Sequence, residues 1–364
     1  MKNMFLENKD INTGRQPEFD YLKGLFVPMI ILIHAFQLLG GTTEPLYEVF
    51  YPICTMTGST IFLFVMGMGS TYSRSSEKQM ILSGVKLIAW QIVWNVFALA
   101  LPFLMGQGIR AFFGLSMEMW PMAVQQVMVL LQYINIFFIA GVIYLFLAFF
   151  KKIRLPAWGY LVIAAVVMVA TPWLYMVDWK TGIPAVDYTL TLFFGGRDSV
   201  SLVFLPHFVY SVFGVWFGRI LRRTADKKRL YLTFLPGALV IGIAYLVYSI
   251  VISDTLTDFC NFVSYEYTFP GIFRMLTNLS WVLVTAGALW SVHGWIKKYR
   301  LLDNLLLHFN KKTSAYYGIH PFLYALAGSI AITTPFGWLP CFVIAVADTI
   351  FCWLVMRLWE KIKN

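Results

Sequence analysis

Ten apolar runs, each close to the length of a bilayer-spanning helix, dominate the sequence. An α-helix needs about 20 consecutive apolar residues to cross the hydrocarbon core of a membrane. The composition agrees, because 59% of the residues are hydrophobic and only 13% are charged, whereas a soluble domain has about 25% charged residues. We therefore predict an all-α integral membrane protein with about ten transmembrane helices, at residues 22–41, 50–71, 81–105, 121–150, 156–175, 200–220, 230–252, 271–296, 314–332 and 338–357.

The basic residues fall in short clusters between these runs, and their distribution orients the chain. With the N-terminus inside, all but four of the 28 lysines and arginines lie on the cytoplasmic side, as the positive-inside rule requires. The first 18 residues are polar and lack the features of a signal peptide. We expect residues 1–21 to form a cytoplasmic N-terminal segment and the C-terminus to be cytoplasmic too. The formal charge of +10 then reflects orientation, and no nucleic-acid partner is expected.

No linker, internal repeat or low-complexity segment divides residues 1–364, which indicates a single polytopic membrane domain. The run 121–150 is its least regular part. Thirty residues exceed the hydrocarbon core at about 1.5 Å per residue, so we expect a tilted, kinked or partly re-entrant helix there. Two separate spans would move the basic cluster at 151–154 to the outer side, which the charge rule disfavours.

The first span carries one histidine deep in an apolar run. Lys23 and His34 are eleven residues apart, which places them on one helix face, three turns or about 16 Å apart along the axis. Gln37 continues the same stripe, and Pro28 is expected to kink the helix. An imidazole at this depth is either a hydrogen-bond bridge between helices or a functional group. The aligned Lys23 and Gln37 favour function, and imidazole suits proton transfer near neutral pH.

A few other polar residues lie within the predicted spans. Gln91 and Asn95 share a helix face and are expected to bridge helices. Asp348 lies in mid-span, where a carboxylate must be paired or protonated, and a histidine is one candidate partner. Arg274, in an outward half-span, is a candidate to bind an acidic acceptor or to pair with Asp348. The four cysteines show no metal-binding spacing, and no metal is expected.

The opening "FDYLKGLFVPMIILIHAFQLLG" (19–40) has an acidic residue, a basic residue and a glycine, followed by an apolar run and a histidine. This pattern resembles the first helix of the transmembrane acyltransferase superfamily, which includes the family-three acyltransferases and the heparan-glucosaminide N-acetyltransferase-like proteins. The superfamily carries a basic residue and a histidine in that helix, although here lysine replaces the usual arginine. The segments "GSTIFLFVMGMGSTYSRSS" (58–76) and "GVKLIAWQ" (84–91) resemble its second and third helices. "TSAYYGIHPFLYA" (313–325) resembles its penultimate helix, which carries a serine, a tyrosine and a histidine.

The resemblance implies transfer of an acyl group, most simply acetyl, from cytoplasmic acyl-CoA to a hydroxyl or amine of an extracytoplasmic acceptor such as a cell-surface glycan. It implies a multi-pass protein of the bacterial cytoplasmic membrane. His34 would act as general base or acyl carrier, and His320 would orient it, contact the donor or bridge two helices. Asp348 completes the catalytic candidates. The candidates to bind the phosphates of the donor are Lys23, Arg74, Lys78 and Lys86. The positive-inside orientation of the chain would by itself also explain these cations.

Acceptor binding is assigned to Gln37, to Arg274 and to His207, which follows a proline near the outer end of the sixth span and for which interfacial packing is the alternative. The expected partners are acyl-CoA, the acceptor and the lipid bilayer, and a homo-oligomer is left open. The competing interpretation is a secondary transporter of a small polar solute, because ten spans with mid-membrane polar residues and prolines suit one. The inverted repeat expected of a transporter is not evident.

Overall fold

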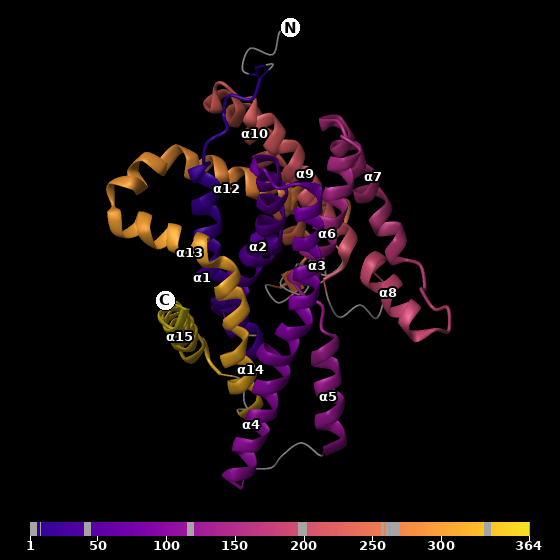
Figure 1. The fold of residues 1–364 in the computed structure, drawn as a ribbon, viewed down its shortest axis with the longest axis vertical. Coiled ribbons are helices and arrows are strands. Elements are labelled where there is room, and N and C mark those ends of the chain that lie inside the picture. The colour runs from indigo at the N-terminus through magenta and orange to yellow at the C-terminus, as the bar shows by residue number, and fades with distance from the viewer. Residues whose placement is uncertain are drawn as a thin grey trace. The chain divides into compact units, whose positions relative to one another are not determined.

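The computed structural model describes residues 6–7, 9–39, 45–114, 120–195, 202–255, 258–259, 262, 270–330 and 336–363. Within these residues the regular structure is helical (Figure 1), apart from isolated bridge positions such as the antiparallel pair Leu6 and Thr224. The helices are α1 (Pro17–Leu39), α2 (Pro45–Tyr72), α3 (Glu77–Trp94), the π-helical η1 (Asn95–Ala100), α4 (Leu101–Phe112), α5 (Trp120–Gln132), α6 (Ile136–Lys152), α7 (Ala157–Tyr175), α8 (Pro184–Phe194), α9 (Phe204–Arg222), α10 (Lys227–Val251), α12 (Ile272–Lys298), α13 (Arg300–Ile319), α14 (Pro321–Ile330) and α15 (Trp338–Lys363).

Eight helical runs among the described residues are long and apolar enough to cross a bilayer. They coincide with eight of the ten predicted runs, so the prediction of an all-α, multi-pass membrane protein is confirmed at this level. The runs 50–71 and 314–332 are not among the eight. The total of ten spans and the cytoplasmic position of both termini stay predictions.

Two of the predicted spans are interrupted. The run 121–150 contains α5 and α6, separated at residues 133–135, and the Asn135 side chain begins α6 by accepting a hydrogen bond from the N–H of Phe137 at 2.8 Å. The run 314–332 is divided between α13 and α14 at His320, because Pro321 lacks the N–H that would continue the helical ladder. The break within 121–150 is an irregularity of the kind expected there, and Val124–Lys152 still counts as one candidate span. For 314–332 the prediction of one continuous helix is wrong.

The predicted span 81–105 is part of a longer helical run, Glu77–Phe112, which comprises α3, η1 and α4. The extra residue per turn in η1 begins at Asn95, and such π segments often mark functional positions.

The chain divides into two compact units. Unit 1 comprises residues 1–22, 55–88 and 134–295, and unit 2 comprises residues 23–54, 89–133 and 296–364. The single membrane domain stays a prediction.

Helices α2 and α9 of unit 1 approach at glycines. A Cβ atom placed on Gly67 would lie 1.9 Å from the carbonyl oxygen of Ser211, and one on Gly214 would lie 2.1 Å from that of Phe64. The Ser211 hydroxyl donates a hydrogen bond across the same interface to the carbonyl of Leu63 at 2.8 Å. Small residues allow this contact, and close packing of this kind is what holds helices together in lipid.

The N-terminal segment of unit 1 caps the end of α9. The backbone N–H groups of Ile11 and Asn12 donate to the carbonyl of Arg222, and the Asn12 amide donates to that of Leu221. An ion pair of 2.7 Å between Arg222 and Asp10 adds to this contact. The last carbonyls of a helix have no intrahelical donors, so this segment satisfies them and is held in place by them.

Unit 2 satisfies its helix ends with buried side chains. Asn95 donates to the carbonyls of Leu131 and Tyr133, both at 2.8 Å, and Gln91 donates to the carbonyl of Tyr133 at 3.1 Å. These bonds supply donors at the end of α5, where a bilayer would supply none. The expected bridging role of Gln91 and Asn95 therefore takes a specific form, the capping of an interrupted helix.

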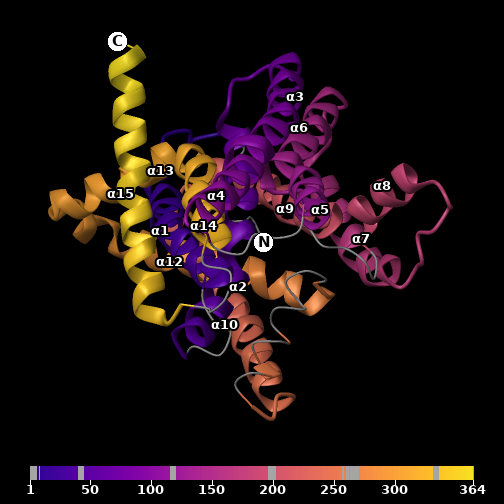
Figure 2. The ribbon, with the colours of Figure 1, turned by 90° about the horizontal axis from the view of Figure 1, so that it is seen from below.

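Helices α4 and α14 of unit 2 lie side by side in both views (Figures 1 and 2). A Cβ atom on Gly106 would lie 1.6 Å from the Ser329 hydroxyl oxygen. The buried Arg110 donates a hydrogen bond of 2.9 Å to the carbonyl of Ile330, the last residue of α14. This pairing fixes α14, whose first residue follows His320.

Candidate functional site

His34 and His320 meet in unit 2. Nδ1 of His34, on α1, lies 2.7 Å from Nε2 of His320, at the junction of α13 and α14. The two rings are nearly parallel, at 15°, with centroids 5.0 Å apart. His320 is completely buried, whereas the His34 side chain is half-buried. Two intramembrane imidazoles that are 286 residues apart in the sequence thus form one hydrogen-bonded pair.

The positions of the protons follow from the other contacts of this pair. Nδ1 of His320 lies 2.9 Å from the carbonyl oxygen of Tyr316, and a carbonyl can only accept. Nδ1 of His320 therefore carries the proton, and Nε2 of the neutral ring accepts one. His34 must then donate from Nδ1, which leaves the lone pair of its Nε2 outside this chain of hydrogen bonds.

The local sequence explains why His320 is held so firmly. Tyr316 lies four residues earlier on the same helix, and its carbonyl also accepts the backbone N–H of His320 at 3.0 Å. The rings of Tyr317 and Tyr324 contact the His320 ring at steep angles, with centroids 5.6 and 5.9 Å away. Tyr317 is in turn stacked on Trp94. The imidazole has little freedom to rotate in this aromatic surrounding.

Asp348 of α15 joins the cluster through a tyrosine. Its carboxyl is completely buried and lies beside the Tyr324 hydroxyl and the Cys352 thiol, whose sulfur is 3.8 Å from Oδ1. The Tyr324 hydroxyl donates to the carbonyl of Ile31 on α1 at 2.9 Å. Asp348 therefore contacts neither histidine through a described hydrogen bond, and Tyr324 stands between it and His320.

The other predicted residues divide between the two units. Lys23 and Gln37 lie on α1 in unit 2 with His34; the Lys23 side chain is half-buried and that of Gln37 is exposed. Arg74, Lys78 and Lys86 are exposed side chains of unit 1. The structure thus brings together the three catalytic candidates, and the assignment of the four cations to a donor remains a prediction.

His207 and Arg274 are both buried in unit 1. Nδ1 of His207 bonds to the carbonyl of Val203 at 2.7 Å, and its Nε2 lies 3.4 Å from the Ser59 hydroxyl. Arg274 donates to the Tyr245 hydroxyl at 3.1 Å and lies over the same ring. For His207 these contacts link α2 with α9. The proposed acceptor-binding role of either residue stays a prediction.

Sequence reasoning missed Tyr324, Tyr316 and Cys352. Tyr324 and Tyr316 lie four residues after and before His320, so helical spacing places both on the face of a singled-out histidine. Cys352 has the same relation to Asp348. The contact of His320 with His34 was one of the alternatives that the resemblance implied for His320. No local signal in the sequence indicates it, because it joins distant parts of the chain.

The pair can accept a proton and share the resulting charge over two rings. This is the arrangement by which a base is oriented by a second group, as in hydrolase triads. Among the described residues no group of three metal-ligating side chains occurs. No protein-family model, curated protein or solved structure matches the chain.

Proposed function

We propose that this protein is a membrane-bound acyltransferase, which moves an acyl group, most simply acetyl, from cytoplasmic acyl-CoA to a hydroxyl or amine of an extracytoplasmic acceptor. The favoured acceptor is a glycan of the cell surface, and the favoured location is the bacterial cytoplasmic membrane. The observation that carries the proposal is the hydrogen-bonded pair of His34 and His320, in which the Tyr316 carbonyl fixes the direction of both protons.

The pair supports general-base catalysis in a specific way. As the acceptor oxygen or nitrogen attacks the thioester carbonyl, Nε2 of His34 takes its proton. The carbon–sulfur bond of the donor then breaks, and the CoA thiolate leaves with that proton to become the free thiol. The positive charge on His34 during this step is shared with His320 through the Nδ1–Nε2 hydrogen bond. A positioned base of this kind contributes about 10²–10⁴ in rate.

The same lone pair would serve if His34 were the acyl carrier. Nε2 would attack the thioester carbonyl, and an acyl-imidazole would form as the CoA thiolate left. The acceptor would then take the acyl group and release its proton to solvent or to CoA. The two routes differ in whether the label from the donor stays on the protein in the absence of acceptor.

The remaining residues are proposed for binding. A polyanionic donor needs cations, and lysine or arginine contacts to phosphate are charge-assisted hydrogen bonds. The residues assigned to the donor are Lys23, Arg74, Lys78 and Lys86, and those assigned to the acceptor are Gln37, His207 and Arg274. No resident cofactor or metal is required by this chemistry.

A secondary transporter is the second candidate, and the interruption between α13 and α14 favours it. Discontinuous helices with buried ionisable groups form the binding sites of many transporters. Here the interruption lies at His320. Asp348, on the following helix α15, is completely buried. A transporter would use these groups to bind a proton or solute and would not need acyl-CoA.

The test measures CoA release and the fate of the label when the purified full chain is incubated with radiolabelled acetyl-CoA. We expect slow release of CoA in the wild type and a loss of about 10²–10⁴ in His34→Ala, the contribution of a positioned base. His320→Gln should lose less, because His34 remains while its orientation is lost. His293→Gln is the matched control, since that imidazole bonds only to the local carbonyl of Trp290 among the described contacts.

Two outcomes would contradict the proposal. One is CoA release by His34→Ala at the rate of His293→Gln. The other is the absence of any CoA release together with solute uptake into proteoliposomes that does not depend on CoA, which would favour the transporter.

A further inference from the structure

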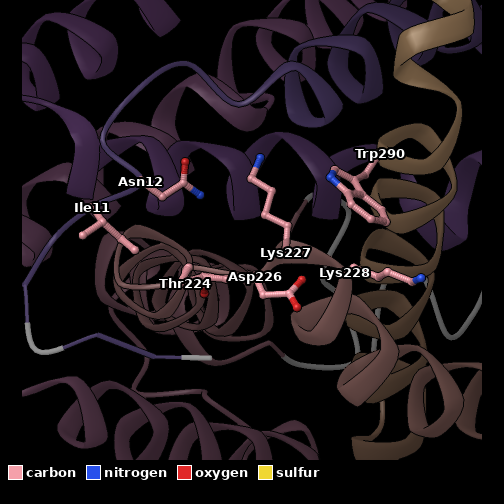
Figure 3. A pocket seen from close by; sticks show the side chains of 8 residues that line it. Ile11, Asn12, Thr224, Asp226, Lys227, Lys228 and Trp290 are labelled. Carbon is pink, nitrogen blue, oxygen red and sulfur yellow. The ribbon is translucent and has the colours of Figure 1, made fainter. Parts of the chain in front are cut away.

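Unit 1 contains a cleft of about 470 Å³ at the connection between α9 and α10 (Figure 3). The N-terminal segment contributes Asn12, the first turn of α10 contributes Lys227 and Lys228, and α12 contributes Trp290. A volume of this size is within the range of small-molecule sites, about 300–1,000 Å³. It exceeds what a bare inorganic ion fills, so the cleft has room for an ion with an organic group attached.

The charges around the cleft leave one cation without a counter-ion. Lys227 forms an ion pair of 2.8 Å with Glu18, whose carboxylate is 1% exposed and also accepts the Tyr231 hydroxyl at 3.2 Å. Asp226 is paired with Arg229 at 3.5 Å.

Lys228, in contrast, is exposed and forms no hydrogen bond or ion pair with the described residues. Within each of these two ion pairs the positive and negative charges cancel. The net charge at the wall of the cleft is therefore the single positive charge of Lys228.

The same wall offers donors and an aromatic plane. Lys227 and Lys228 are the first two residues of α10, and their backbone N–H groups have no intrahelical acceptor. The Asp226 carboxylate, which also lines the cleft, caps the same terminus by accepting from the N–H of Arg229 at 3.1 Å. The Trp290 indole is half-buried, with one ring face tilted against Tyr231 at a centroid distance of 5.4 Å. In Figure 3 the Lys227 side chain rises between Asn12 and Trp290, and Lys228 extends below the indole. Cation, donors and a planar apolar wall therefore face one space.

We propose that this cleft binds a phosphate ester that carries an organic group, with Lys228 as the counter-ion and Trp290 as the apolar wall. The basic connection between α9 and α10 is expected in the cytoplasm, where two sources of this chemistry occur. One is the headgroup of an anionic phospholipid, and the other is a soluble nucleotide. The proposal concerns unit 1 alone and does not depend on acyl transfer.

The experiment has two arms on the purified full chain. In the first, equilibrium binding of radiolabelled ADP is measured in detergent. In the second, the chain is placed in phosphatidylcholine bilayers with and without phosphatidylglycerol, and native mass spectrometry counts the phosphatidylglycerol molecules that remain bound. Binding in the ADP arm assigns the site to a nucleotide, and binding in the lipid arm assigns it to a headgroup.

The variants separate a specific site from general positive charge. Lys228→Gln should weaken binding about fivefold, the effect of removing one lysine near a phosphate-bearing surface, and Trp290→Leu should weaken it as well. The matched controls, Lys152→Gln and Trp158→Leu, alter exposed residues of unit 1 outside the cleft and should change nothing. Lys228→Gln removes no described contact, so it remains a valid test if Trp290→Leu fails to fold. Binding of neither probe, or equal losses in Lys228→Gln and Lys152→Gln, would overturn the proposal.

Discussion

The close approach of α2 and α9 makes a sharp prediction about a single methyl group. In Gly67→Ala the new Cβ would lie 1.9 Å from the carbonyl oxygen of Ser211, and 2.7 and 2.9 Å from its C and Cα atoms. A carbon and a carbonyl oxygen in contact lie about 3.3 Å apart, so the helices must separate by roughly 1.4 Å. The obstructing atoms belong to the backbone, and no side-chain rotation can relieve the clash.

The cost has two parts. Overpacking of this kind costs about 1–3 kcal/mol. The separation also breaks the hydrogen bond from the Ser211 hydroxyl to the Leu63 carbonyl, which contributes about 0.5–1.5 kcal/mol. Alanine has an offsetting advantage of about 1 kcal/mol in helix propensity. The expected net loss of stability in Gly67→Ala is therefore about 0.5–3.5 kcal/mol.

Gly69→Ala is the matched control, because it lies on the same helix and a Cβ there meets nothing within 4 Å. It should be neutral or gain up to about 1 kcal/mol. The assay heats both variants in the same detergent and measures the folded fraction by size-exclusion chromatography. Each kcal/mol of lost stability should lower the midpoint temperature of unfolding by about 2–4 °C, the value for a domain of about 150–250 residues. Ser211→Ala, which removes the hydrogen bond without the clash, separates the two parts of the cost.

Equal midpoints for Gly67→Ala and Gly69→Ala would refute the reasoning. They would mean that α2 and α9 can move apart without loss, and that the glycine contact does not hold unit 1 together. A large loss in Ser211→Ala with none in Gly67→Ala would instead assign the stability of this interface to its hydrogen bond.

Two further predictions concern single side chains. Asn95→Leu leaves the Leu131 carbonyl without its donor and should destabilise the chain by about 1–3 kcal/mol, as measured by thermal unfolding against Gln125→Leu, an exposed position on α5. Hydrogen bonds from the Thr181 hydroxyl and N–H hold the pKa of Asp187 below its ordinary value. This contact should therefore persist from neutral pH down past the ordinary aspartate pKa and be lost only as pH falls through the lowered one. The protection of the Thr181 N–H from hydrogen exchange, relative to an unfolded chain at the same pH, should persist over that range in the wild type. It should be lost at every pH in Asp187→Ala, which removes the acceptor.

The membrane-spanning character of the chain could be predicted because it depends on properties that are local in sequence. An apolar run of 20 residues in lipid has to be a helix, since every backbone group must find its partner within the segment. The predicted runs 156–175 and 230–252 accordingly match α7 and α10 closely. One residue of the candidate site, His34, could be identified for a similarly local reason. His34 was singled out because an imidazole within such a run is conspicuous.

The helix interruptions were harder to foresee. The polar residues Gln132 and Asn135 flank the break at 133–135, but neither glycine nor proline occurs there to mark the end of α5. What permits the break is a pair of donors, Gln91 and Asn95, some 40 residues earlier. Their availability depends on how α5 packs beside η1. Such long-range compensation leaves no periodic signal in the sequence.

An intramembrane polar side chain can be assigned a role only after the backbone near it has been accounted for. Gln91 and Asn95 are occupied by the carbonyls at the end of α5, which explains them without any chemistry. His320 is partly occupied in the same way, because its Nδ1 bonds to the Tyr316 carbonyl. One nitrogen of that ring remains, and it accepts from His34. Of the two imidazoles, His34 alone keeps a lone pair outside these described hydrogen bonds. In the proposed reaction the proton would therefore be taken by His34, and His320 would determine which nitrogen of His34 is basic.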